Sequence, residues 1–235
     1  MIDNKILALK YRPQEFKDLI GQEVMAQTVT NAITLGKTPN AYLLTGIRGV
    51  GKTTTARLIA KSLNCLKNED KKINCSSKNF CNSCTEIINS NHMDILEMDA
   101  ASKTGIDDIR ELIDNARYSP TSAKFKIFII DEVHMLSKQA FNGLLKTLEE
   151  PPPKLKFILA TTEVRKIPVT ILSRCQRFDL KRVNLEKLFT HLKSITAKEN
   201  GRISNSALRL IARASEGSVR DAISLLDRAL ISQSI

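Results

Sequence analysis

Residues 46–53 read GIRGVGKT, and this stretch decides the fold. It matches the pattern G-x-x-x-x-G-K-[ST], follows the apolar run AYLLT at 41–45, and precedes an amphipathic stretch at 53–63. A glycine-rich turn between a strand and a helix lets backbone N–H groups converge on phosphate oxygens at the positive end of the helix dipole. The alternative is an ordinary glycine turn with an exposed lysine. The strand–loop–helix context favours the phosphate loop and predicts a nucleotide-binding α/β domain.

The phosphate loop supplies the first candidate site residues. Lys52 is expected between the β- and γ-phosphates, and the hydroxyl of Thr53 is expected to bind Mg²⁺. The residues of this stretch expected to bind ATP are Gly46, Ile47, Arg48, Gly49, Val50, Gly51, Lys52, Thr53 and Thr54.

A second apolar run, IFII at 127–130, ends in two carboxylates, Asp131 and Glu132. Such a run indicates a strand buried on both faces, and parallel sheets bind ligands at the carboxyl ends of their strands. Asp131 is therefore expected to bind Mg²⁺ with Thr53, and Glu132 to orient and deprotonate the attacking water. An acidic pair that merely caps a helix is the alternative, which the phosphate loop disfavours. His134 is interpreted as structural.

Short apolar runs alternate with amphipathic stretches through the first 180 residues, a pattern typical of a parallel α/β sheet. The expected strands cover 41–45, 94–98, 126–131, 156–161 and 176–180. The expected helices among them cover 23–35, 53–63, 106–117 and 138–148, and the last stops before three prolines.

After residue 180 the strand signals end. Three helical patterns follow, at 185–199, 206–214 and 219–231. Glycines and serines mark their ends and starts, namely Gly201, Gly217, Ser204 and Ser218. The sequence thus predicts an α/β nucleotide-binding domain over 1–180 and a three-helix lid over 181–235.

Four of the five cysteines lie close together, in the spacing C-x9-C-x5-C-x2-C: Cys65, Cys75, Cys81 and Cys84. The C-x2-C half is typical of zinc, and the polar stretch 67–79 suits a surface excursion. Four thiolates complete a tetrahedral shell, so the expected Zn²⁺ is structural. Unpaired surface thiols or redox pairs are the alternative. Cys175 is expected to pack against other residues without a chemical role.

Composition excludes several classes of protein. The 235 residues are 42% apolar, which is too much for a disordered chain, and they contain no apolar run near the roughly 20 residues of a membrane span. The N-terminus has no apolar signal segment, so the cytoplasm is the expected compartment. The net charge of +11 indicates an anionic partner, and residues 181–235 carry ten basic against five acidic residues.

Together these motifs resemble the gamma/tau family of bacterial DNA polymerase III, AAA+ ATPases of the sliding-clamp loader. The resemblance rests on KYRPQEFKDLIGQ, AYLLTGIRGVGKTTTARLIAKSLNC, MDAASKTGIDDIREL, IIDEVHMLSKQAFNGLLKTLEEPP, LATTEVRKIPVTILSRCQRF and EGSVRDAISLLD. The cysteine module over 65–84, directly after the phosphate-loop helix, separates this family from most AAA+ proteins. The resemblance implies a five-stranded sheet of order 5-1-4-3-2.

The resemblance also implies roles for residues that spacing alone leaves unassigned. Arg174 matches the arginine finger that reaches the γ-phosphate of a neighbouring subunit, which makes it a catalytic candidate beside Lys52 and Glu132. Arg220 matches sensor 2 and Thr162 matches sensor 1. The residues implied to lie beside the base and ribose are Tyr11, Arg12 and Pro13. The residues implied to face DNA phosphates are Ser102, Lys103 and Thr104.

The implied function is an ATP-hydrolysing clamp-loader subunit that opens the β sliding clamp and loads it onto primed DNA. The implied partners are delta, delta-prime and further gamma/tau copies, the β clamp, and the backbone of primer–template DNA, with no membrane. This hydrolase would serve the DNA-directed DNA polymerase III holoenzyme, a transferase, without a polymerase site of its own. The family differs in having x8 and x2 cysteine gaps and a helical collar domain without counterpart here.

Three alternatives stay open at this point. Another AAA+ machine, such as a helicase motor or a eukaryote-like clamp-loader small subunit, is disfavoured by the cysteine module. A non-hydrolysing scaffold like the delta-prime subunit is disfavoured by the intact phosphate loop and by Asp131 and Glu132. A zinc-ribbon DNA-binding module would bind DNA tightly without ATP and lose that binding when zinc is chelated.

Overall fold

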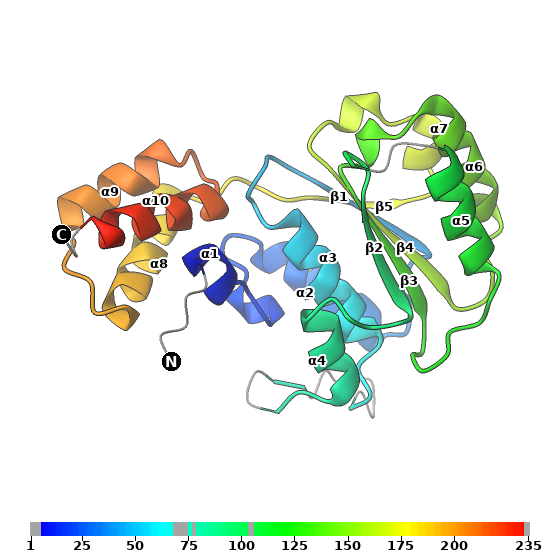
Figure 1. The fold of residues 1–235 in the computed structure, drawn as a ribbon, viewed down its shortest axis with the longest axis horizontal. Helices are drawn as coiled ribbons and strands as arrows, with labels where there is room; N and C mark the ends of the chain where they lie inside the picture. The colour runs from blue at the N-terminus through cyan, green and yellow to red at the C-terminus, as the bar shows by residue number, and fades with distance from the viewer. Residues whose placement is uncertain (1–5, 68–74, 77–78, 103–105, 233–235) are drawn as a thin grey trace.

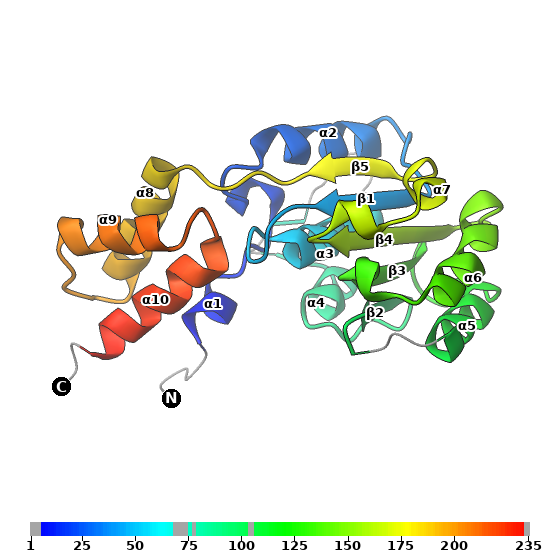
Figure 2. The same ribbon diagram turned by 90° about the horizontal axis from the view of Figure 1, so that it is seen from above.

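The computed structural model describes residues 6–67, 75–76, 79–102 and 106–232. Within these residues a five-stranded, entirely parallel sheet has the order β2-β3-β4-β1-β5, which confirms the order that the resemblance implies. The strands are β1 (Ala41–Thr45), β2 (Ile95–Asp99), β3 (Lys126–Asp131), β4 (Leu155–Thr161) and β5 (Gln176–Asp179). Helices cover both faces of the sheet, and the strand arrows point toward a separate group of helices (Figures 1 and 2).

Two cores lie on opposite faces of the sheet because successive side chains of a strand point to opposite sides. In β3, Phe128 and Ile130 join the core under helices α5 (Ile106–Ala116) and α6 (Lys138–Glu149). Their neighbours Ile127 and Ile129 join the core under α2 (Glu23–Thr34) and α3 (Lys52–Leu63). All four are fully buried, which confirms the central strand predicted from the IFII run.

The remaining elements before residue 180 are short. They are α1 (Leu7–Lys10), α4 (Asn82–Ile88), α7 (Val169–Leu172) and the 3-10 turns η1 (Phe16–Asp18), η3 (Val133–Met135) and η4 (Val164–Lys166). Every boundary predicted for a strand or a helix falls within one residue of the observed one. None of the helices in the described part of the chain is long and apolar enough to span a membrane.

Asp94 stands directly before β2, which begins one residue later than predicted. Asp94 is only 2% exposed, and its carboxylate accepts backbone N–H bonds from Thr121 (2.7 Å), Ser122 (2.8 Å) and Ala123 (2.8 Å). Burial by itself raises the pKa of this carboxyl, but the three N–H donors outweigh burial and lower it. Asp94 therefore ties the loop before β3 to the start of β2.

The chain after residue 180 forms three helices, α8 (Leu185–Lys198), α9 (Asn205–Ala214) and α10 (Val219–Ile231), which pack around a third core. Ser204 and Ser218 accept N–H bonds from residues three positions on, so both predicted N-caps are confirmed. The N-terminal helix α1 belongs to this core as well, through Leu7, whose backbone N–H donates to Asp227 over 3.3 Å. Figure 2 shows α1 beside α10.

Candidate nucleotide and metal sites

The phosphate loop joins β1 to α3 and contacts the start of α10. Gly49 has φ +75°, and a Cβ there would lie 2.1 Å from Ser218 Oγ. A Cβ at Gly46 would lie 2.7 Å from the carbonyl oxygen of Leu180. The carbonyl oxygen of Gly49 also accepts the backbone N–H of Arg220 over 3.2 Å. The loop therefore needs glycine to fit against Leu180, just after β5, and against the start of α10.

Lys52 begins α3 and is only 5% exposed. Its ammonium donates to the carbonyl oxygens of Gly46 (3.1 Å) and Ile47 (3.2 Å) and lies 3.8 Å from Glu132 Oε1. Burial lowers the pKa of Lys52, and the nearby carboxylates of Glu132 and Asp131 oppose that shift. The structure thus places a buried cation within the loop, beside the two carboxylates that end β3.

Thr53 and Asp131 meet directly, since the Thr53 hydroxyl hydrogen-bonds to Asp131 Oδ2. The other carboxylate oxygen, Oδ1, accepts the backbone N–H of Glu132 over 2.9 Å. One hydroxyl and one carboxylate at the same point form a hard oxygen donor set, which fits Mg²⁺. The structure therefore brings together the two residues that the sequence predicts as magnesium ligands.

Glu132 lies one residue beyond β3 in the left-handed conformation, with φ +46°. Its Oε2 accepts the hydroxyl (2.9 Å) and the backbone N–H (3.1 Å) of Thr162, which follows the end of β4. The adjacent ends of β3 and β4 thus bring the sensor 1 candidate to the predicted general base.

A cavity of about 750 Å³ lies between the phosphate loop, the N-terminal segment and the lid helices. The predicted residues that line it are Tyr11, Arg12, Pro13, Arg48, Gly49, Val50, Gly51, Lys52, Thr53, Thr54, Asp131, Glu132 and Arg220. Sequence reasoning missed further lining residues, among them Asp99, His191, Ile223 and Ser224. Asp99 could have been predicted as a site residue, because it ends the strand next to the one that ends at Asp131. His191 could not, because no spacing rule marks a histidine on a lid helix.

The N-terminal segment contacts the phosphate-loop helix and the lid. Arg12 Nε donates to the hydroxyl of Thr54 over 3.1 Å, and burial, followed by the charge of Arg57, lowers the pKa of Arg12. The Tyr11 hydroxyl hydrogen-bonds to Glu199 just after α8. Burial and this carboxylate raise the pKa of Tyr11 to about 12. The cavity therefore has walls from both ends of the chain.

Arg174 lies outside the cavity, after helix α7. Its guanidinium pairs with Glu149 at the end of α6 and donates to the carbonyl oxygen of Thr170 over 2.6 Å. The side chain is 32% exposed. The structure does not bring Arg174 to the site of its own chain.

The DNA prediction is described only at Ser102, since Lys103 and Thr104 lie outside the described residues. Ser102 is exposed, and its hydroxyl donates to the carbonyl oxygen of Asp99 over 3.0 Å. This contact places Ser102 at the carboxyl end of β2.

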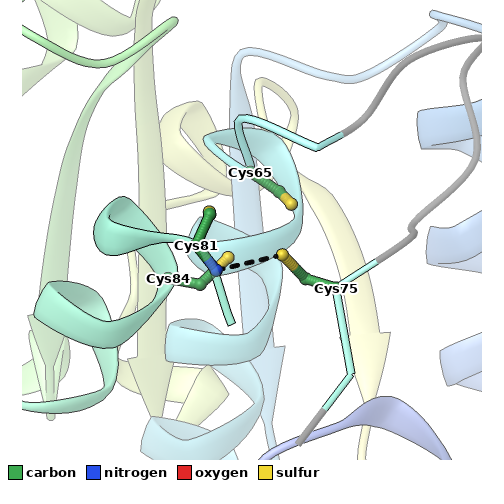
Figure 3. A group of neighbouring side chains, drawn as sticks. All are labelled: Cys65, Cys75, Cys81 and Cys84. Carbon is green, nitrogen blue, oxygen red and sulfur yellow. Dashed lines mark hydrogen bonds between the residues drawn. The ribbon is translucent and has the colours of Figure 1, made fainter. Parts of the chain in front are cut away.

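The four clustered cysteines converge, as Figure 3 shows, with their sulfur atoms all within 4.8 Å of one another. A tetrahedral zinc with Zn–S bonds of about 2.3 Å requires sulfur atoms about 3.8 Å apart, so a small contraction suffices. Cys65 follows α3, Cys81 caps α4 and Cys84 lies within α4, while Cys75 comes from the loop between these helices. The donor set fits a closed, structural zinc site.

The surroundings of the clustered cysteines shift the pKa values of their thiols in different directions. Burial opposes ionisation of Cys81, but backbone N–H groups of Cys84 and Leu66 outweigh it and lower the pKa to about 7. Burial raises the pKa of Cys65 to about 11. The ammonium of Lys61, which is 3% exposed and 4.3 Å from the Phe80 ring centroid, also faces the cluster and favours thiolates there.

Cys175 packs against the core under α5 and α6, as predicted.

The sheet order, the phosphate loop and the helical lid define an AAA+ protein of the P-loop class. Solved structures agree at the level of fold. RuvB of Thermotoga maritima, a Holliday junction branch migration motor, matches with a TM-score of 0.68 and 22% identity, over 95% of this chain and 67% of that one. At that identity the likeness concerns the fold alone.

Sequence relatives are more specific. A family model described as "DNA polymerase III, delta subunit" matches residues 21–184, and one described as "DNA polymerase III clamp loader subunit, ATPase lid domain" matches residues 187–234. DNA polymerase III subunit tau of Escherichia coli is 49% identical over 97% of this chain, and that of Bacillus subtilis is 46% identical over 94%. Subunit gamma of Buchnera aphidicola from Schizaphis graminum is 50% identical over 96%.

The chain therefore belongs to the gamma/tau family of DNA polymerase III clamp-loader subunits. It spans 35% of the length of the Escherichia coli relative and 61% of that of the Buchnera relative. Among the alternatives left open by the sequence, membership in this family is incompatible with a separate helicase motor and with an unrelated zinc-ribbon module.

Proposed function

We propose that this chain binds and hydrolyses ATP as a subunit of the clamp loader, and that it uses ATP to open the β sliding clamp and load it onto primed DNA. The observation that carries the proposal is the convergence, in one cavity, of Lys52, Thr53, Asp131 and Glu132. A scaffold that only bound partners would have no need of a buried lysine between the phosphate loop and two carboxylates.

Each residue of this group receives a role. Lys52 holds the β- and γ-phosphates, and Thr53 and Asp131 hold Mg²⁺, which would neutralise charge on the phosphates when bound. Glu132 orients the attacking water and accepts its proton. Thr162 holds the Glu132 carboxylate through a hydrogen bond. Arg220 is hydrogen-bonded to the phosphate loop through its backbone, and it couples nucleotide binding to the position of the lid.

The division of the chain supports this role. We assign residues 1–180 to the nucleotide-binding domain and 181–235 to the lid, with a structural Zn²⁺ in the module 65–84. The cavity touches both parts, so nucleotide binding can change how the lid sits on the sheet. We place the protein in the cytoplasm, where its proposed partners act.

Arg174 is proposed to act on a neighbouring subunit, because it lies away from its own cavity and keeps unused N–H donors. An arginine finger supplied in trans contributes on the order of 10³–10⁵ in rate, so the isolated subunit should hydrolyse ATP slowly. The proposed partners are delta, delta-prime, further gamma/tau copies and the β clamp. Primer–template DNA would be bound through its phosphates, with strong salt dependence and little sequence preference.

The test is ATP turnover by the full-length protein, alone and assembled with its partner subunits, clamp and primed DNA. Glu132→Gln should abolish turnover in the assembled complex while leaving ATP binding intact, because it removes the base without removing a phosphate contact. Arg174→Ala should lower turnover of the complex by at least about 10³ without changing ATP binding by the isolated subunit. Unchanged turnover in Glu132→Gln would refute the assignment of the base, and loss of ATP binding in isolated Arg174→Ala would refute action in trans.

A further inference from the structure

His134 lies in the turn η3, two residues beyond Glu132, with a side chain that is only 6% exposed. A carboxylate faces each nitrogen of its ring. Nδ1 lies 3.4 Å from Glu132 Oε2, and Nε2 lies 3.4 Å from Glu163 Oε1. Nδ1 also lies 3.0 Å from the hydroxyl oxygen of Thr161. The ring therefore lies beside Oε2 of the proposed general base Glu132.

The contacts of His134 differ from those of a histidine that only packs in a core. His92 is a contrast within the same chain. It is 5% exposed, and its Nδ1 accepts the backbone N–H of Asp94 over 3.1 Å. Both ring nitrogens of His134 instead face side-chain oxygens, from residues at the carboxyl ends of β3 and β4. The surroundings of the His134 ring are therefore polar, and they lie at the same edge of the sheet as the cavity.

Glu132 needs such support because its own backbone does not orient it. It stands at the N-cap position of η3 with φ +46°, and its carboxylate makes no capping hydrogen bond. Thr162 binds only one of its oxygens, Oε2. The ring of His134 borders that same oxygen, so the other one, Oε1, is left turned toward Lys52 at 3.8 Å.

The ring of His134 is itself held by Thr161 and Glu163. The Thr161 hydroxyl oxygen accepts the backbone N–H of Glu163 over 3.0 Å, which ties together two of the three residues that contact the ring. Lys166 binds the Glu163 carboxylate over 2.9 Å. This hydrogen bond and the neighbouring His134 lower the pKa of Glu163, so Glu163 faces the ring as a carboxylate at neutral pH.

We propose that His134 is a positioning residue for Glu132: with Thr162 it holds the carboxylate in the orientation that presents Oε1 to the nucleotide cavity. The inference rests on the proposed function, since it takes Glu132 as the general base. A side chain with three rotatable bonds loses catalytic efficiency when it samples other rotamers, and a misplacement of about 1 Å can cost on the order of 10²-fold in rate. Of the residues that His134 contacts, namely Glu132, Thr161 and Glu163, only Glu132 lines the nucleotide cavity.

The experiment compares variants of the full-length protein assembled with its partner subunits, clamp and primed DNA. His134→Ala should lower kcat by about tenfold or more and leave both KM and the Kd for ATP within about twofold of the wild type. His134→Asn should recover part of the loss, because its amide can occupy the position of Nδ1 beside Thr161. Met135→Ala is the matched control, since Met135 lies in the same turn, is 46% exposed, and should keep wild-type kcat.

Glu163→Gln provides a second, independent variant, because the Glu163 side chain is 49% exposed and its substitution should not unfold the chain. It should lower kcat modestly by loosening the ring. Wild-type kcat in both His134→Ala and Glu163→Gln would overturn the proposal. Equal losses of kcat and ATP affinity, without recovery in His134→Asn, would also overturn it and indicate a structural role. Turnover that survives in Glu132→Gln would instead refute the proposed base, and the inference with it.

Discussion

Replacing the buried Asp94 by alanine should be among the most destabilising single substitutions of a polar residue in this domain. The carboxylate accepts three backbone N–H bonds of 2.7–2.8 Å and one from the Ser122 hydroxyl at 3.2 Å, and the residue is 2% exposed. Hydrogen bonds to a charged group contribute about 1.5–3 kcal/mol each, and their contributions do not add fully when they share one acceptor. Removing the shared acceptor leaves three N–H groups without their partner, so we expect a loss of about 3–5 kcal/mol.

The dependence on pH follows from the direction of the pKa shift. The pKa of Asp94 is lower in the folded than in the unfolded chain, so its contribution is fully present above the unfolded pKa of about 3.9. The contribution is lost as the pH falls through the folded pKa. The stability difference between the wild type and Asp94→Ala should therefore be constant near neutral pH and shrink only in acid.

The assay is thermal unfolding of the full-length protein together with hydrogen exchange of the amides at 121–123. For a domain of this size a loss of 3 kcal/mol lowers Tm by roughly 6–12 °C. Asp107→Ala is the matched control, because the Asp107 side chain is 88% exposed and its surface pair with Arg110 contributes about 1 kcal/mol at most. A loss below about 1 kcal/mol in Asp94→Ala, or amides at 121–123 that keep their protection, would refute the reasoning.

Two further predictions concern the metal site and the cavity wall. Cys84→Ser, at a fully buried ligand, should release zinc and lower Tm, and metal analysis of the purified variant checks this. Retained zinc in Cys84→Ser would contradict the four-cysteine site. Tyr11→Phe removes the hydrogen bond to Glu199 and should weaken ATP binding severalfold by loosening the N-terminal segment from the lid. Titration with a fluorescent ATP analogue measures this, and an unchanged Kd would show that the segment is held by packing alone.

Local patterns were sufficient for most of the fold because they depend on near neighbours in the chain. The IFII run predicts a strand buried on both faces, and the serines before α9 and α10 predict helix starts that the structure confirms. Asp94, directly before β2, binds a loop 27 residues away, a contact that no local pattern encodes. The packing of α1 on the lid core was missed for the same reason, since Leu7 meets Asp227 from the opposite end of the chain.

The candidate site shows the same division. Glycine, lysine and hydroxyl residues at fixed spacing predicted the phosphate loop, and an apolar run ending in two carboxylates predicted Asp131 and Glu132. Both motifs can be recognised in the sequence because each consists of a short, continuous stretch of residues. The meeting of Thr53 with Asp131 could then be expected from the parallel sheet, which brings strand ends to one edge.

Tertiary structure alone decided which groups surround that site. A single histidine after an acidic pair carries no spacing signal for His134, yet the folded chain places its ring between Glu132 and Glu163. His191 reaches the cavity only because the lid helix α8 packs beside the N-terminal segment. Local spacing is enough to predict the groups that we propose to act on phosphate, because they lie in short, continuous stretches of chain. The orientation of those groups depends on contacts between distant segments, which exist only once the sheet and the lid have packed.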